Sequence, residues 1–183
     1  MPLTLDANTA LVVIDLQKGT LNWPIPTAHP VKDILARSAE LCKAFRSKNL
    51  PVILVNVAGR PPGRSESKMN LALPPDWTEL APELDRQPSD YTVTKLQVGA
   101  FYGTALDLIL RRHHVTQVVL VGIATSVGVE TTARNAYDYG FNVVTVTDAM
   151  TDMDPESHKH SVEKVFPKIS ERATTEEVLA LLK

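Results

Sequence analysis

The chain has 183 residues, of which 44% are hydrophobic and 22% are charged, an ordinary globular composition that argues against a disordered chain. Nineteen Lys and Arg against 21 Asp and Glu leave a formal charge of -2, which gives no electrostatic basis for nucleic acid or an anionic membrane as the main partner. A single cysteine excludes an intramolecular disulfide framework and a cysteine-rich zinc site.

The chain start and the apolar runs predict neither a secretory signal nor a membrane span. Residues 1–6 contain no basic region and no apolar region. The longest apolar runs are far shorter than the roughly 18 residues needed to cross a bilayer. We therefore expect a soluble, cytoplasmic protein that forms a single domain over residues 1–183.

Short β-branched runs alternate with longer amphipathic stretches along the chain. The runs predict strands at residues 10–14, 51–56, 91–95, 117–122, 142–147 and 168–172. The stretches predict helices over 31–45 and from 104 to about 113, one that ends near Tyr139, one that begins after Asp154 and one that begins at Thr174. Runs that are apolar throughout belong in a parallel sheet covered on both faces. The sequence therefore predicts a doubly wound α/β fold around a six-stranded, mostly parallel sheet.

Residues 59–89 fit neither pattern. This proline-rich excursion carries Trp77 near its middle, and its apolar side chains argue against disorder. Long irregular segments in compact domains are usually functional. We expect a folded flap that either covers its own active site or bridges two subunits.

Three polar features follow predicted strands. Asp15 comes directly after the first strand, Lys95 ends the third, and a turn beginning at Gly122 follows the fourth and leads into a helix. In open parallel sheets, ligands bind beyond the carboxyl ends of the strands. A single carboxylate or lysine at the end of a strand is often only a loop anchor or a solvated charge. The convergence of all three features at one edge of the sheet is what favours a functional site.

These residues resemble the isochorismatase-like hydrolase superfamily, the cysteine-hydrolase group that includes nicotinamidases and N-carbamoylsarcosine amidases. The resemblance covers nearly the whole chain and rests on three segments, residues 10–17, 95–106 and 122–136. It implies a three-layer α/β/α domain, with the catalytic aspartate at Asp15 and the catalytic lysine at Lys95. It also implies a cis peptide bond between Ile123 and Ala124.

The chain departs from the amidase branch at Gly128, where that branch carries its nucleophilic cysteine. Without a thiol the acyl-enzyme route has no nucleophile. Cys42 lies on the apolar face of a predicted helix and is expected to be a buried structural thiol. Ser126 is the substitute nucleophile to consider, although it lies two positions early and no histidine base can be assigned to it. Glycine at this position also resembles the isochorismatases themselves, in which an aspartic acid protonates a vinyl ether without covalent catalysis.

We therefore expect a hydrolase of a small, anionic organic molecule, with vinyl-ether hydrolysis as the favoured reaction. Asp15 would act as acid or base and Lys95 as its electrostatic partner, and the backbone from Thr125 to Gly128 would bind an anion. The alternatives are a non-catalytic protein that binds a metabolite or a partner and, less favoured, an amidase. The expected substrate-binding residues are Gln17, Trp23, Arg60, Phe101, Thr125, Ser126 and Val127.

We expect no metal and no cofactor. The region after the second strand, residues 57–62, contains no histidine and so lacks the Asp-x-His arrangement of nicotinamidases. Arg60 in this region either pairs with a substrate carboxylate or lies in solvent. The resemblance implies a homo-oligomer, a dimer or tetramer, and we expect neither nucleic acid nor membrane as a partner.

Overall fold

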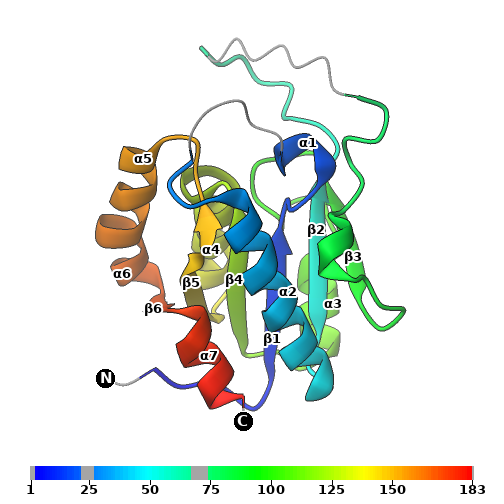
Figure 1. Ribbon diagram of the computed structural model, residues 1–183, viewed down its shortest axis with the longest axis vertical. Helices are drawn as coiled ribbons and strands as arrows, with labels where there is room; N and C mark the ends of the chain where they lie inside the picture. Colours follow the sequence, from blue (N-terminus) through cyan, green and yellow to red (C-terminus); the bar gives the residue numbers. More distant parts are fainter. Residues whose placement is uncertain (1–2, 22–26, 67–73, 183) are drawn as a thin grey trace.

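A six-stranded parallel sheet in the order β3-β2-β1-β4-β5-β6 forms the centre of the computed structural model, which describes residues 3–21, 27–66 and 74–182 (Figure 1). The strands are β1 (Thr9–Ile14), β2 (Val52–Val57), β3 (Tyr91–Lys95), β4 (Gln117–Ile123), β5 (Asn142–Thr151) and β6 (Glu171–Ala173). This confirms the predicted doubly wound α/β fold.

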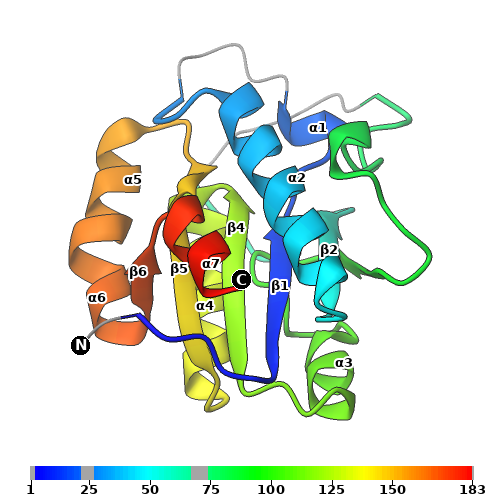
Figure 2. The same cartoon turned by 60° about the horizontal axis from the view of Figure 1, so that its bottom comes forward.

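Helices cover both faces of the sheet (Figures 1 and 2). One face packs against α2 (Val31–Ser47) and α7 (Thr175–Leu181), and the opposite face packs against α3 (Leu106–Arg112) and α4 (Glu130–Asp138). The remaining helical segments are α1 (Lys18–Leu21), η1 (Pro82–Leu84), the π-helical turn η2 (Thr125–Val129), α5 (Pro155–His160), the π-helical turn η3 (Ser161–Val165) and α6 (Phe166–Ile169).

The central strands are buried on both sides. Every residue of β1 and of β4 is buried. Within β1, Val12 and Ile14 belong to the core on the α3 and α4 face, whereas Leu11 and Val13 belong to the core on the α2 and α7 face. This two-sided burial is the physical reason for the continuous apolar runs in the sequence.

Two strand predictions were wrong at their ends. The last strand spans only Glu171–Ala173, because the helical segment before it continues through α6 to Ile169. The fifth strand extends to Thr151 rather than to residue 147, after a register shift of its pairing with β4. The extension brings the end of β5 up to the turn that follows β4.

The helix starts agree more closely with the sequence. Asp154 caps α5 by accepting the backbone N–H of Glu156, and Thr174 forms a capping box with Glu177 at the start of α7. The helix predicted from residue 104 begins at Leu106, and the Thr104 hydroxyl accepts its backbone N–H. Helix α2 runs two residues beyond the predicted end.

The second half of the excursion folds back on its own chain. Lys18 forms ion pairs with Asp76 and Glu79 at 2.7 and 2.6 Å, and the backbone N–H of Gly19 donates to the Trp77 carbonyl. A Cβ at Gly19 would lie 3.0 Å from the Trp77 Cβ, so the two residues are in close contact. Trp77 is therefore packed on α1 of its own chain.

A buried ion pair ties the end of the excursion to α2. The Arg46 guanidinium contacts the Asp90 carboxylate through Nε and Nη2 at 3.0 and 2.7 Å, and Nη2 also donates to the Leu84 carbonyl. The Asp90 side chain is 1% exposed. Cys42 lies on the same helix and is buried, as predicted, and burial raises the pKa of its thiol to about 12.

Within the described ranges, no helix is both long enough and apolar enough to cross a membrane.

Candidate active site

The site lies where the winding of the sheet changes direction. From β1 the chain moves outward through β2 to β3, and it then returns to the other side of β1 with β4. The carboxyl ends of β1 and β4 flank this switch point, which is where ligands bind in open α/β sheets. Asp15 follows β1, and η2 with Gly128 follows β4.

Asp15 leaves β1 in an unusual backbone conformation. Its φ of 52° lies in the left-handed region, while its N–H still donates to the Val55 carbonyl of β2. Non-glycine residues in this region are uncommon and cluster at functional sites. This turn directs the carboxyl group over the end of the sheet.

Asp15 and Lys95 form a buried ion pair. Lys95, from the end of β3, places Nζ 2.8 Å from Asp15 Oδ2, and the two side chains are 2% and 8% exposed. Burial raises the pKa of Asp15 to about 6, and the charge and hydrogen bond of Lys95 partly oppose this rise. Desolvation therefore outweighs the neighbouring cation, and the acid form of Asp15 is populated near neutral pH.

The hydrogen bonds of the pair leave one carboxylate oxygen unused. Besides Asp15, the Lys95 ammonium donates to the carbonyls of Gln97 and Val98 at 3.2 and 2.9 Å, so its three N–H groups all have acceptors. Asp15 Oδ1 is buried and has no hydrogen-bond partner in the described part of the chain. Asp15 Oδ1 is therefore left as an unsatisfied acceptor, whereas the ammonium group has no N–H to spare.

Gly128 adjoins the Asp15 carboxyl group. A Cβ added to this buried glycine would lie 3.1 Å from Ile14 Cγ2, 3.3 Å from the Ile123 carbonyl oxygen and 3.4 Å from Asp15 Oδ2. These distances are shorter than ordinary van der Waals contacts, so the glycine lets the backbone pack closely against the Asp15 carboxyl group. Asp15, Lys95 and Gly128 lie together, as the sequence predicts, and their catalytic roles stay a prediction.

The turn η2 is held by the neighbouring end of β5 and by α5. The Asp152 carboxylate accepts both the N–H and the hydroxyl of Ser126, at 2.8 and 2.7 Å. The hydroxyl of the fully buried Thr125 lies 2.8 Å from His158 Nδ1. The turn begins after the Ile123–Ala124 peptide bond, which is cis as predicted.

These contacts limit which residues of the turn η2 can act as a nucleophile or bind a ligand. The Ser126 hydroxyl donates to the Asp152 carboxylate, so it has no histidine partner of the kind that activates a serine nucleophile. Its N–H is also engaged, and the Val127 N–H donates to the Ala124 carbonyl. The predicted anion binding by this backbone would therefore rest on the N–H groups of Thr125 and Gly128. The Val127 side chain is 48% exposed.

The other expected binding residues lie in different settings. The Gln17 amide donates to the carbonyls of Val57 and Trp77 and accepts the Val57 N–H, so it joins α1, β2 and the excursion. Phe101 is buried and its ring packs against Tyr139 and Phe141. Arg60 is exposed, and Trp23 lies outside the described residues.

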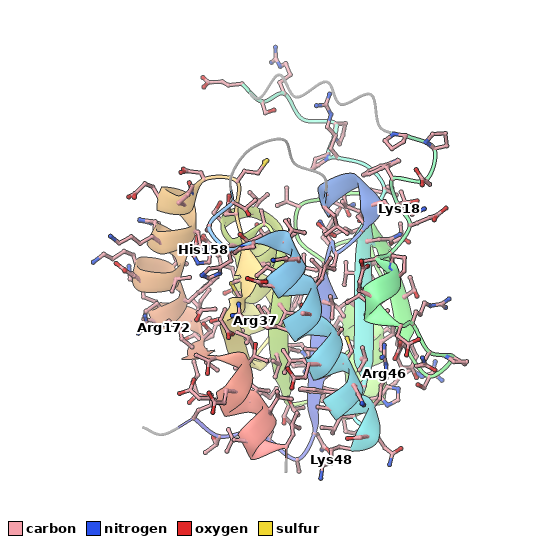
Figure 3. All side chains as sticks on the ribbon, in the orientation of Figure 1. Lys18, Arg37, Arg46, Lys48, His158 and Arg172 are labelled. Atoms are coloured by element: carbon pink, nitrogen blue, oxygen red, sulfur yellow. The ribbon has the colours of Figure 1, made fainter. Side chains whose placement is uncertain are left out.

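Sequence reasoning missed Asp152 and His158. Asp152 follows β5 only because the strand extends to Thr151; in the sequence the carboxylate next to the apolar run is Asp148, so no local signal pointed to Asp152. His158, labelled on α5 in Figure 3, lies with its ring 4.9 Å from that of His29. Burial and the nearby His29 lower the pKa of His158. In the described ranges, no group of three or more His, Cys, Asp or Glu is placed to hold a metal ion.

The fold and this buried ion pair define a class, the α/β proteins that carry ionisable side chains at a topological switch point. Residues 9–177 match the model of the isochorismatase domain family. The chain is 42% identical to the isochorismatase family protein YwoC of Bacillus subtilis, covering 96% of this chain and 94% of that protein. The structure resembles an isochorismatase family protein from Burkholderia thailandensis with a TM-score of 0.86 and 43% identity, covering 98% and 97% of the two chains.

A more distant relative has a named activity. Ureidoacrylate amidohydrolase RutB of Pseudomonas syringae is 28% identical, over 81% of this chain and 72% of that protein. The chain belongs to the isochorismatase family, and it is a hydrolase.

Proposed function

We propose that the enzyme hydrolyses a vinyl ether of a small, anionic organic molecule, with Asp15 as general acid and without a covalent intermediate. The observation that carries this proposal is the position of Asp15. Its carboxyl group is desolvated, has a pKa raised to about 6 and packs against Gly128. A general acid works best when its pKa lies near the operating pH.

The proposed reaction needs only one protein proton. Asp15 protonates the terminal vinyl carbon, which leaves an oxocarbenium ion and the Asp15 carboxylate. Water adds to the cation and gives up a proton, and the resulting hemiketal breaks down into a ketone and an alcohol. The Lys95 ammonium, 2.8 Å from Oδ2, stabilises the carboxylate that forms as the proton leaves.

Gly128 supports this reaction in place of the acyl-enzyme route. A Cβ at residue 128 would lie 3.1 to 3.4 Å from its nearest atoms, which is tighter than ordinary van der Waals contact, so a nucleophilic side chain does not fit there unless its neighbours shift. Amide or ureide hydrolysis is the second candidate, favoured by the name of the RutB relative. The absence of a thiol at residue 128 argues against it.

The test is a panel of vinyl ethers, amides and ureides of small carboxylic acids, incubated with the purified protein. We expect turnover of a vinyl ether, a loss of about 10²-fold or more in Asp15→Asn, and little loss in the matched variant Ser126→Ala. A chelating agent should leave the rate unchanged. Vinyl-ether turnover that survives Asp15→Asn would place the chemistry elsewhere, and turnover of amides alone would favour the second candidate.

A further inference from the structure

The Asp15–Lys95 ion pair is held between two stretches of backbone from different parts of the chain. On the Lys95 side, the ammonium group donates to the carbonyls of Gln97 and Val98, in the loop that follows β3. On the Asp15 side, the turn η2 packs against the carboxyl group at Gly128, where an added Cβ would lie 3.4 Å from Oδ2. The position of the two charged groups therefore depends on how the loop after β3 is joined to η2.

One buried hydroxyl joins these two stretches. Thr132, on α4, is fully buried, and its Oγ1 accepts the backbone N–H of Ala100 at 3.1 Å and donates to the Gly128 carbonyl at 2.7 Å. Ala100 belongs to the loop after β3 and is also fully buried. The hydroxyl thus uses its one donor on η2 and an acceptor position on the loop.

The loop also packs closely on α4 beside this bridge. A Cβ at Gly99 would lie 2.6 Å from Asn135 Oδ1 and 2.9 Å from Thr131 Cγ2, and both of these residues are on α4. Such close contact requires glycine before Ala100. The helix therefore fixes the loop through its shape as well as through the Thr132 hydroxyl.

Loss of the hydroxyl would affect the charged pair through the backbone. The buried N–H of Ala100 would lose its acceptor, and a buried donor without a partner is costly, so the loop would shift to reach another one. The carbonyls that hold Lys95 lie just before Ala100 in the same loop. Lys95 is the charged group that lowers the pKa of Asp15 against the effect of burial. A shift of the ammonium group away from Oδ2 would therefore raise the pKa of Asp15.

We infer that Thr132 is a positioning residue of the site, whose hydroxyl fixes the loop that holds Lys95 relative to the turn that packs on Asp15. It acts through two backbone groups rather than on a substrate. The inference rests on the proposed function only in taking Asp15 as the reacting group.

Thr132→Val tests the hydroxyl, because valine has nearly the same shape and no hydrogen-bonding group. The measurement is the midpoint of Asp15 ionisation, followed by the ¹³C chemical shift of its carboxyl carbon in the protein without substrate. We expect Thr132→Val to raise this midpoint by about 0.5 to 1 pH unit, because Lys95 is held less closely. Thr132→Ser keeps a hydroxyl and should restore the wild-type midpoint. An unchanged midpoint in folded Thr132→Val, or an equal shift in Thr132→Ser, overturns the inference.

Thr9→Val is the matched control. Thr9 is a buried threonine of β1, and its hydroxyl has no hydrogen-bond partner among the described residues. The same substitution there should leave the Asp15 midpoint unchanged, and a shift as large as that of Thr132→Val would overturn the inference. Should Thr132→Val fail to fold, Thr132→Ala removes the same hydroxyl. Hydrogen exchange in the wild-type protein is the second measurement, and rapid exchange of the Ala100 amide would show that the bridge is not formed.

These readouts need no turnover, so they are separate from the test of the proposed reaction. With a vinyl ether that turns over, Thr132→Val should lower kcat about tenfold and change KM less, because the hydroxyl aligns the reacting group. A raised midpoint in a protein that hydrolyses no vinyl ether would leave the inference standing and the proposed reaction wrong. Vinyl-ether turnover with an unchanged midpoint in Thr132→Val would leave the reaction standing and the inference wrong.

Discussion

Gly122 on β4 faces Ile14 on β1 so closely that a Cβ at residue 122 would lie 2.1 Å from the Ile14 carbonyl oxygen. The φ of Gly122 is 118°, a conformation that other residues rarely adopt. Glycine is therefore required beside the residue that precedes Asp15. We expect Gly122→Ala to lower the free energy of unfolding by about 3 kcal/mol, from backbone strain and overpacking together, measured by urea denaturation.

The matched control for that change is Gly140→Ala. Gly140 also has a positive φ, 84°, but a Cβ there would meet no atom within 4 Å. Its cost should be about 1 kcal/mol, from strain alone. Equal costs at the two positions would mean that the contact with Ile14 is unimportant.

Gly128→Ala tests the close packing of the turn against the Asp15 carboxyl group. The added methyl would lie 3.1 to 3.4 Å from its neighbours, so the carboxyl group or the turn must shift. We expect kcat/KM for the vinyl ether to fall about 10²-fold and the free energy of unfolding to fall by about 1–3 kcal/mol. Gly63→Ala, where a Cβ meets nothing within 4 Å, is the control and should keep full activity. Undiminished activity in Gly128→Ala would remove this glycine from the proposed mechanism.

The rate should depend on pH through Asp15. A general acid is active while protonated, so kcat/KM should be constant at low pH and fall as the pH rises through about 6. The decline should reach about tenfold per pH unit. A rate that rises with pH through the same range would assign Asp15 the role of a base.

The Arg46–Asp90 pair should contribute to stability far more than a surface pair does. The Asp90 side chain is 1% exposed, and a variant without its negative charge leaves Arg46 without a counter-ion. We expect Asp90→Asn to cost about 3 kcal/mol in free energy of unfolding. Asp107→Asn is the control, because its pair with Arg111 is about half exposed, and it should cost under about 1 kcal/mol. Similar costs would show that the excursion does not depend on this pair.

The oligomeric state stays a prediction, and we expect a dimer or tetramer by light scattering. Trp77 packs on Gly19 of its own chain, so the interface need not use it. Trp77→Ala should lower stability by loosening the excursion. If the excursion bridges subunits, the same change should also reduce the measured mass. A mass near 20.1 kDa at micromolar concentration would contradict an obligate oligomer.

The apolar runs predicted the sheet because a strand that is buried on both faces needs apolar residues at nearly every position. The convergence of Asp15 and Lys95 could be predicted because strand ends meet at one edge. The hydrogen-bond partners of the Gln17 side chain could not be predicted, because they are backbone groups 40 and 60 residues away along the chain. Arg46 and Asp90 are 44 residues apart, and neither position carries a local signal of burial. Long-range polar contacts depend on the packed structure rather than on a periodic pattern.

Lys95 stands on β3, which is an edge strand and pairs only with β2. Edge elements are the ones that open by local fluctuation without global unfolding. Each opening that detaches the end of β3 would separate Lys95 from Asp15 and leave the acid without its counter-ion. On average, the Asp15–Lys95 ion pair can therefore last no longer than the time between two such openings of β3. Hydrogen exchange at the backbone amides of β3 would measure that rate, and the central strands would exchange more slowly.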